Sequence, residues 1–287
     1  MEVKALFWRR ISRFGLGSEN PKQTYQEKPM RHKELLAVLL LATLLCAAQS
    51  TTLYDSFDHK FLNPSRWAYA FCFSGSGLEL ECVREIRDEQ LHLAHRGFGL
   101  TDSNSGLQNG GAGVGFANSE TIKTIKTDVV VRSVLESPCA ANPGYGSNAG
   151  IWGTFFNAGS GDPNDDVGAA LNLKRVYSDP PGQLIVIGQT FHAGIYSSYF
   201  TIGTVSIGTP VTLTLSWDQP NHQFLISLTN KVTHVTTTGT MPYTFSDTTP
   251  VAGPAKTLGV GGFASNCTAN STSMYVDALF GKVYIGQ

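Results

Sequence analysis

The sequence is poor in charge and has almost no excess of one sign. Charged residues make up 15% of the 287 residues, and the formal net charge is -1. A protein that holds nucleic acid or an anionic membrane surface needs a basic field, which this composition does not supply. Hydrophobic residues make up 41% of the chain, which is enough to bury a core. We therefore expect a folded protein that does not bind nucleic acid.

Several catalytic and metal-binding motifs are missing as well. The chain has no G-x-S-x-G elbow, no P-loop and no CxxC pair. One histidine pair, His92 and His95, has an i, i+3 metal spacing, but alternation along a strand puts the two on opposite faces. The segment from Gly106 to Gly115 is glycine-rich, but it lacks the lysine and the following helix that phosphate binding needs. The scattered histidines are interpreted as surface or turn residues.

No apolar run is long enough to span a bilayer, which takes about 20 residues. The one apolar run, Leu35 to Leu45, follows the basic Met30 to Lys33 and precedes the small residues Cys46 to Ser50. This succession is typical of a secretory signal peptide. We expect an over-extended start or disordered tail at 1–29, a signal peptide at 30–50 and a single domain at 51–287.

The expected signal peptide places the mature protein outside the cytoplasm: secreted, periplasmic or at the cell surface, with no membrane span. The alternative is a cytoplasmic tail before a short signal-anchor. Four cysteines remain after the expected signal peptide is removed, and an even number in an exported chain predicts disulfides. Cys72 with Cys82 is the local pairing, closing a short hairpin through residues 74–77. Cys139 can pair with Cys267 if their strands are neighbours.

Segments with a period of two recur after residue 50, and none shows a sustained helical period. The alternating or β-branched segments are 90–95, 127–135, 183–190, 211–217 and 223–228, with clusters of Asp, Asn, Pro and Gly between them. Such spacing predicts an all-β protein built as a two-sheet antiparallel sandwich. We expect hairpins across 218–222 and 229–231, and pairing of the last strand with the first.

Four segments in order resemble the concanavalin A-like lectin/glucanase superfamily. They are Phe57-Asp58 with 63–67 ending in Trp67, Asp88 to Leu93 with Glu89 where glycine is usual, Val211 to Leu228, and Tyr275 to Phe280. The match covers nearly all of residues 53–285. The resemblance implies a jelly roll with one concave sheet. Many relatives bind or hydrolyse glycans, although a fold by itself does not decide function.

Hydrolysis of a glycosidic bond needs two carboxyl groups that flank it. Laminarinase-type relatives carry them as E-x-D-x-x-E or E-x-D-x-E, and this chain offers Glu79, Glu81 and Glu85. Alternation puts the three on one face of a strand. The middle residue is not Asp, however, the last spacing is one residue too long, and the segment lies early in the fold. We therefore assign no catalytic residue, and an atypical glycoside hydrolase remains the alternative.

Aromatic side chains are the candidates for binding a sugar, because a ring can pack against the apolar face of a sugar. We select Trp152, Phe155, Tyr196 and Tyr199. Trp152 lies between glycines on a strand that we expect near the middle of the concave sheet. Trp217 ends an alternating apolar face and is expected in the core.

The densest group of oxygen ligands is Asp162, Asn164, Asp165 and Asp166. Calcium binds several such oxygens, so this loop is the candidate metal site, with a solvated turn as the alternative. No other cofactor is expected. The sequence predicts a secreted domain that binds carbohydrate or another surface, with a glycan or cell-surface polysaccharide as partner. Besides the hydrolase, a structural or adhesive envelope protein without a small ligand remains open.

Overall fold

The computed structural model describes residues 50–74, 80–100, 106–141, 143, 145–197, 199–268 and 272–287. These residues belong to one compact unit, Gln49–Gln287. The expected signal peptide and the segment before it lie outside the described residues, so those expectations remain predictions. Within the described part of the chain, no helix has the length and apolar character needed to cross a membrane.

One sheet has eight strands. They are β1 Thr52–Asp55, β3 Leu80–Arg87, β4 Gln90–Phe98, β6 Thr124–Ser137, β12 Val211–Asp218, β13 Gln223–Asn230, β14 Thr236–Pro242 and β17 Ser273–Gly286. Their order is β14-β13-β12-β6-β17-β4-β3, and β1 pairs with β17. The pairing of the first strand with the last, which the sequence predicts, is confirmed, and it is antiparallel.

The second sheet has nine strands. They are β2 Trp67–Ser74, β5 Leu107–Phe116, β7 Tyr145–Asn157, β8 Asp166–Val176, β9 Gln183–His192, β10 Ile195–Tyr196, β11 Phe200–Ser206, β15 Thr249–Pro250 and β16 Lys256–Ser265. The order is β10-β9-β8-β7-β16-β5-β2, while β11 pairs with β9 and β15 with β7. The helices in the described residues are three short 3₁₀ turns, Ser119–Thr121, Pro163–Asp165 and Gln219–Asn221.

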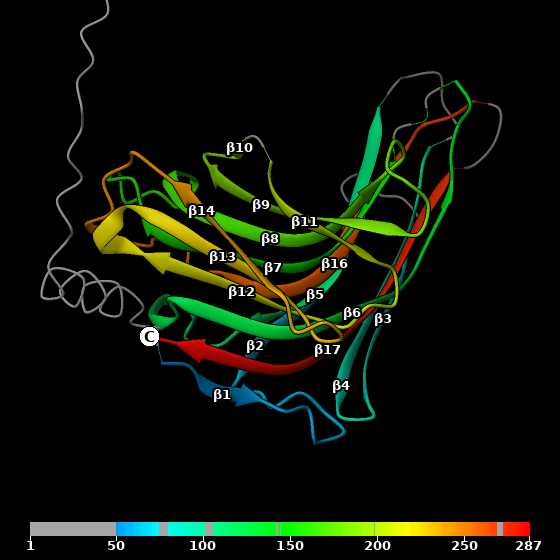
Figure 1. The fold of residues 1–287 in the computed structure, drawn as a ribbon. Coiled ribbons are helices and arrows are strands. Elements are labelled where there is room, and N and C mark those ends of the chain that lie inside the picture. The colour runs from blue at the N-terminus through cyan, green and yellow to red at the C-terminus, as the bar shows by residue number, and fades with distance from the viewer. Residues whose placement is uncertain are drawn as a thin grey trace, which may run out of the picture. The chain divides into compact units, whose positions relative to one another are not determined.

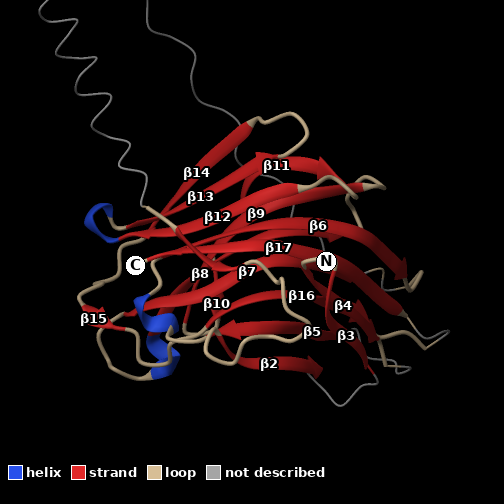
Figure 2. Ribbon diagram, turned by 90° about the horizontal axis from the view of Figure 1, so that it is seen from below, coloured by secondary structure: helices blue, strands red, loops and turns tan. Residues whose placement is uncertain are grey.

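The two sheets form separate layers, and strands make up most of the described unit (Figures 1 and 2). Alternation along β12 shows how the core is built, because Val211, Leu213 and Leu215 are fully buried while the residues between them are not. Ile151 and Leu171 of the other sheet belong to the same buried cluster. The predicted all-β fold, a two-sheet antiparallel sandwich, is confirmed.

The hairpins expected in the second half of the chain are also present. Strands β12 and β13 pair antiparallel from Val211↔Asn230 to Asp218↔Gln223. Strands β13 and β14 also pair antiparallel, but their connection lies at residues 231–235 and not at 229–231. Trp217 is buried in the core as expected, and its indole N–H donates to the hydroxyl of Tyr243, 2.7 Å away. Local alternation is sufficient to predict these strands because hairpins join neighbouring segments.

The described unit contains two disulfides. Cys72 is bonded to Cys82, with their Cα atoms 6.2 Å apart, and Cys139 is bonded to Cys267. The first pairing is the one expected from the sequence, but its context differs. Cys72 lies on β2 of the nine-stranded sheet and Cys82 on β3 of the eight-stranded sheet, so the bond joins two layers rather than two strands of one hairpin.

Candidate functional site

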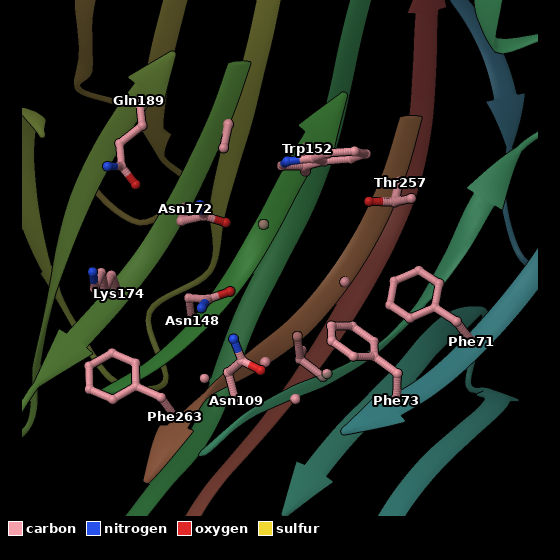
Figure 3. Close-up of a pocket in the computed structure, with 18 of the residues that line it drawn as sticks. Phe71, Phe73, Asn109, Asn148, Trp152, Asn172, Lys174, Gln189, Thr257 and Phe263 are labelled. Carbon is pink, nitrogen blue, oxygen red and sulfur yellow. The ribbon is translucent and has the colours of Figure 1, made fainter. Parts of the chain in front are cut away.

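The outer face of the nine-stranded sheet is hollowed into a groove of about 800 Å³ (Figure 3). Its lining comes from strands β2, β5, β16, β7, β8, β9 and β10, which are neighbours in the sheet although they are far apart in the chain. Because side chains alternate between the two faces of a strand, every second residue of each strand reaches the groove. The register of the strands therefore decides which residues line the groove.

The register arranges many of the lining residues, together with their paired neighbours, in three rows that cross the sheet. The first row is Tyr69, Gly115, Thr257, Trp152, Ala170 and Gln189. The second row is Phe71, Gly113, Gly259, Gly150, Asn172 and Ile187. The third row is Phe73, Gly111, Gly261, Asn148, Lys174 and Ile185. Each row begins with an aromatic residue on β2 paired with a glycine on β5, and the second and third rows continue with a glycine on β16.

Five of these glycines, Gly111, Gly113, Gly150, Gly259 and Gly261, form what we call the glycine floor. The absence of side chains leaves space for the rings of β2, which lie over β5. A Cβ atom at Gly113 would stand 2.5 Å from Cζ of Phe71, which is too close for any side chain. Glycine at this position is required for the close approach of the ring to the backbone.

The three rings of β2, Tyr69, Phe71 and Phe73, form what we call the aromatic ladder. Successive ring centroids are 6.3 Å and 5.9 Å apart. Tyr69 is 44% exposed and Phe73 is 51% exposed, so the ladder offers apolar surface to solvent. Burial raises the pKa of the Tyr69 hydroxyl, which keeps it protonated and able to donate a hydrogen bond. The ladder forms one wall of the groove.

Trp152 lies on the opposite side of the glycine floor, on β7, and is partly exposed. Its ring stacks on Phe191 with centroids 5.0 Å apart and planes 2° apart, and Phe191 in turn contacts Tyr196 at 5.5 Å. The strand lies in the middle of the sheet order, as the sequence predicts. Tyr196 and Tyr199 line the same groove.

Phe155 does not belong to this group, and its selection as a binding residue needs correction. It is 4% exposed and packs in the core, where its ring contacts Phe224. The reason is the alternation itself, since residue 155 is an odd number of positions from Trp152 and so points to the other face. A register shift between Thr154 and Phe156 then turns Phe156 inward too.

Amide side chains supply the polar part of the groove. Asn109, Asn148, Asn172 and Gln189 line it, and Figure 3 shows them around the glycine floor. Gln189 donates to the carbonyl of Ser197 at 3.0 Å. The amides of Asn148 and Asn172 have no hydrogen-bonding partner among the described residues, so both can donate to and accept from a ligand. No Asp or Glu is found among the described residues of the lining.

The glutamates considered for hydrolysis lie elsewhere. Glu79 is outside the described residues. Glu81 and Glu85 are on β3 of the eight-stranded sheet, where Glu81 is paired with Arg96 at 3.1 Å and Glu85 is hydrogen-bonded to His92 at 2.9 Å. The hydrogen bond from His92 lowers the pKa of Glu85, whereas a general acid needs a raised pKa. The structure therefore does not bring Glu81 and Glu85 to the groove.

The Asp162–Asp166 loop has its carboxylates engaged by other groups. Asp166 is buried and accepts the backbone N–H groups of Ala252 and Gly253 at 2.9 Å and 2.6 Å. Asp162 accepts the N–H of Asn164 at 2.8 Å, and Asp165 is hydrogen-bonded to His192. Nowhere in the described residues are three or more His, Cys, Asp or Glu side chains arranged to hold a metal. The donor set therefore fits a hydrogen-bonded turn rather than calcium.

The sequence interpretation missed the aromatic ladder and the amides. A signal for the ladder exists, since Tyr69, Phe71 and Phe73 alternate with small residues on one strand. No comparable signal marks Asn148, Asn172 or Thr257, which the register of three different strands brings together.

The fold and the groove define a two-sheet antiparallel β-sandwich with an aromatic- and amide-lined groove on one sheet. Neither a family model nor a curated protein matches the chain. Similar solved structures include lectin II from Ulex europaeus, with 12% identity over 75% of this chain and 98% of that one and a TM-score of 0.31. Winged bean acidic lectin complexed with methyl-α-D-galactose has 12% identity over 76% of this chain and 100% of that chain, with a TM-score of 0.33.

A protein of unknown function from Shewanella oneidensis MR-1 gives 13% identity over 90% of this chain and 97% of that chain, with a TM-score of 0.36. These identities and TM-scores are too low to support an argument from the similar structures. The two-sheet sandwich is established instead by the strand pairing of this chain. The groove must therefore be interpreted from its own residues.

Proposed function

We propose that the protein is an exported carbohydrate-binding domain whose binding site is the groove on the nine-stranded sheet. The observation that carries the proposal is the combination of partly exposed rings on both sides of the glycine floor with the amides of Asn148 and Asn172, which have no hydrogen-bonding partner among the described residues. Small-molecule sites in general pair an apolar surface with a few polar groups that fix orientation. A sugar matches this pattern, because it has an apolar C–H face and a rim of hydroxyl groups.

The geometry favours binding over hydrolysis. Cleavage of a glycosidic bond takes a pair of carboxyl groups on either side of it. The described lining of the groove holds no carboxyl group, and Glu81 and Glu85 lie on the other sheet. Rings and amides can hold a sugar but cannot supply the acid and the nucleophile or base. We therefore assign no catalytic role to the groove.

Export is supported by the cysteines. The described unit contains the disulfides Cys72–Cys82 and Cys139–Cys267, and such bonds form and persist in oxidising compartments. The expected signal peptide at residues 30–50 is consistent with this placement. A polysaccharide of a cell surface or of the surroundings is then the ligand that an exported domain would meet.

The test is calorimetry after a glycan array has selected a ligand. Trp152→Ala should weaken binding by about 1–3 kcal/mol, roughly 5- to 150-fold, if a sugar stacks as a base does on an aromatic ring. Phe61→Ala is the matched control, because Phe61 is 84% exposed and does not line the groove. An array with no binding, or equal affinity in Trp152→Ala, would favour a structural or adhesive protein instead.

A further inference from the structure

The groove contains a single charged side chain among its described residues, that of Lys174 on β8. Its ammonium donates a hydrogen bond to the hydroxyl of Tyr199 and lies 3.9 Å from the centroid of that ring. Both contacts are with neutral groups. No described carboxylate forms an ion pair with Lys174, and the lining offers none.

Several other basic side chains are compensated by acceptors. Lys231 is paired with Asp128, and Arg175 with Glu136. Lys256, which is fully buried, donates to two backbone carbonyl groups, each 2.7 Å away. Partly buried charges are normally paired in this way, because taking a charge out of water is costly. Lys126 is also half-buried and lies 5.7 Å from the centroid of the Tyr284 ring, with no ion pair among the described residues. Lys174 differs from it because it faces the groove.

Two neutral donors lie beside this cation. Asn148 is the residue directly opposite Lys174 in the pairing of β7 with β8. Asn172 precedes Lys174 by two residues on the same strand and so shares its face. Figure 3 shows the three side chains together at the edge of the glycine floor. An ammonium and two amide groups can together donate to the several oxygens of one anionic group.

We propose that the ligand of the groove is an acidic glycan, whose carboxylate or sulfate group binds Lys174, Asn148 and Asn172 while a sugar ring packs on Trp152. This inference rests on the proposed carbohydrate-binding function and names its substrate class. A groove with one sign of charge and walls of low dielectric concentrates the field, so the charge discriminates between acidic and neutral sugars. Lys174 is thus the residue that determines specificity.

Two matched pairs of probes test the inference and separate the two anions. Oligogalacturonate is compared with its methyl ester, and κ-carrageenan oligosaccharide with its desulfated form, by calorimetry at low salt. The acidic member of at least one pair should bind about tenfold more tightly, as a charge-assisted hydrogen bond predicts. The pair that shows the difference identifies the anion. Added salt should reduce the difference, because a partly exposed pair is screened.

Two variants test whether Lys174 causes the preference for acidic over neutral probes. Lys174→Met should abolish the preference for the acidic member of each pair. Lys282→Met is the control, because it removes the same charge from an exposed position on the eight-stranded sheet. Equal binding of both members of each pair to the unaltered protein, or a preference that survives in Lys174→Met, overturns the inference. If neutral probes bind in a Trp152-dependent manner, the proposed function stands alone; if no probe binds, both fail.

Discussion

His95 should make the stability of this protein depend on pH in the mildly acidic range. It lies on the inner face of β4 and is 0% exposed. Neither ring nitrogen has a hydrogen-bonding partner among the described residues. A Cβ atom at Gly110 would lie 2.9 Å from its Nε2, so glycine leaves the space that the ring fills. Burial lowers the pKa of His95 from 6.5 to about 4.

The sign of the effect follows from which state binds the proton first. Above pH 6.5 the imidazole is neutral in both the folded and the unfolded chain, so it contributes nothing to the pH dependence. As the pH falls from 6.5 to about 4, the unfolded chain takes up the proton and the folded chain does not. Stability is therefore lost over this window, and the two pKa values correspond to about 3 kcal/mol.

Urea unfolding at a series of pH values between 4 and 8 measures this loss. The quantity to compare is the free energy of unfolding of His95→Leu minus that of the unaltered protein. This difference should rise by about 3 kcal/mol as the pH is lowered from 8 to 4, because only the unaltered protein loses stability through His95. Any packing defect adds a constant that does not change with pH. His59→Leu, at an exposed position, is the control. Parallel pH profiles for the unaltered protein and His95→Leu would refute the reasoning.

Two further predictions concern bonds that hold the groove sheet in place. Replacing Cys72 and Cys82 together with Ala should lower the free energy of unfolding by about 2–3 kcal/mol, because the unfolded chain gains the freedom of the opened loop; urea unfolding with no change would contradict this. Asp166→Asn should cost about 2 kcal/mol, since an amide cannot accept every hydrogen bond that the carboxylate accepts from Ala252, Gly253 and Asn157. Thermal unfolding checks it against Asp165→Asn, and an equal change in both variants would count against the buried network.

The sequence predicts the fold where the evidence is local. Val211 to Leu228 alternates and carries its turn between the two strands, so both the strands and their pairing follow from it. The order of strands in the nine-stranded sheet does not follow in the same way. Strand β16 lies between β5 and β7 although it comes about a hundred residues later in the chain, and no nearby pattern specifies that position.

The candidate site shows the same division. Trp152 could be placed on the outer face of a central strand because glycines flank it. Strict alternation along that strand would have removed Phe155 from the candidate sugar-binding residues. His95 shows a further gap, because the sequence places it at the surface and the structure buries it. The grouping of Asn148, Asn172 and Lys174 needs the register between β7 and β8, which is set by the packing of the whole sheet.

The pairing of β1 with β17 has a practical consequence for handling the protein. Both strands belong to the eight-stranded sheet, while the groove opens on the outer face of the other sheet. A linker attached after Gln287 therefore leaves from the layer that does not carry the groove. Immobilised on a sensor or bead through such a linker, the domain would present its groove to the surrounding solution.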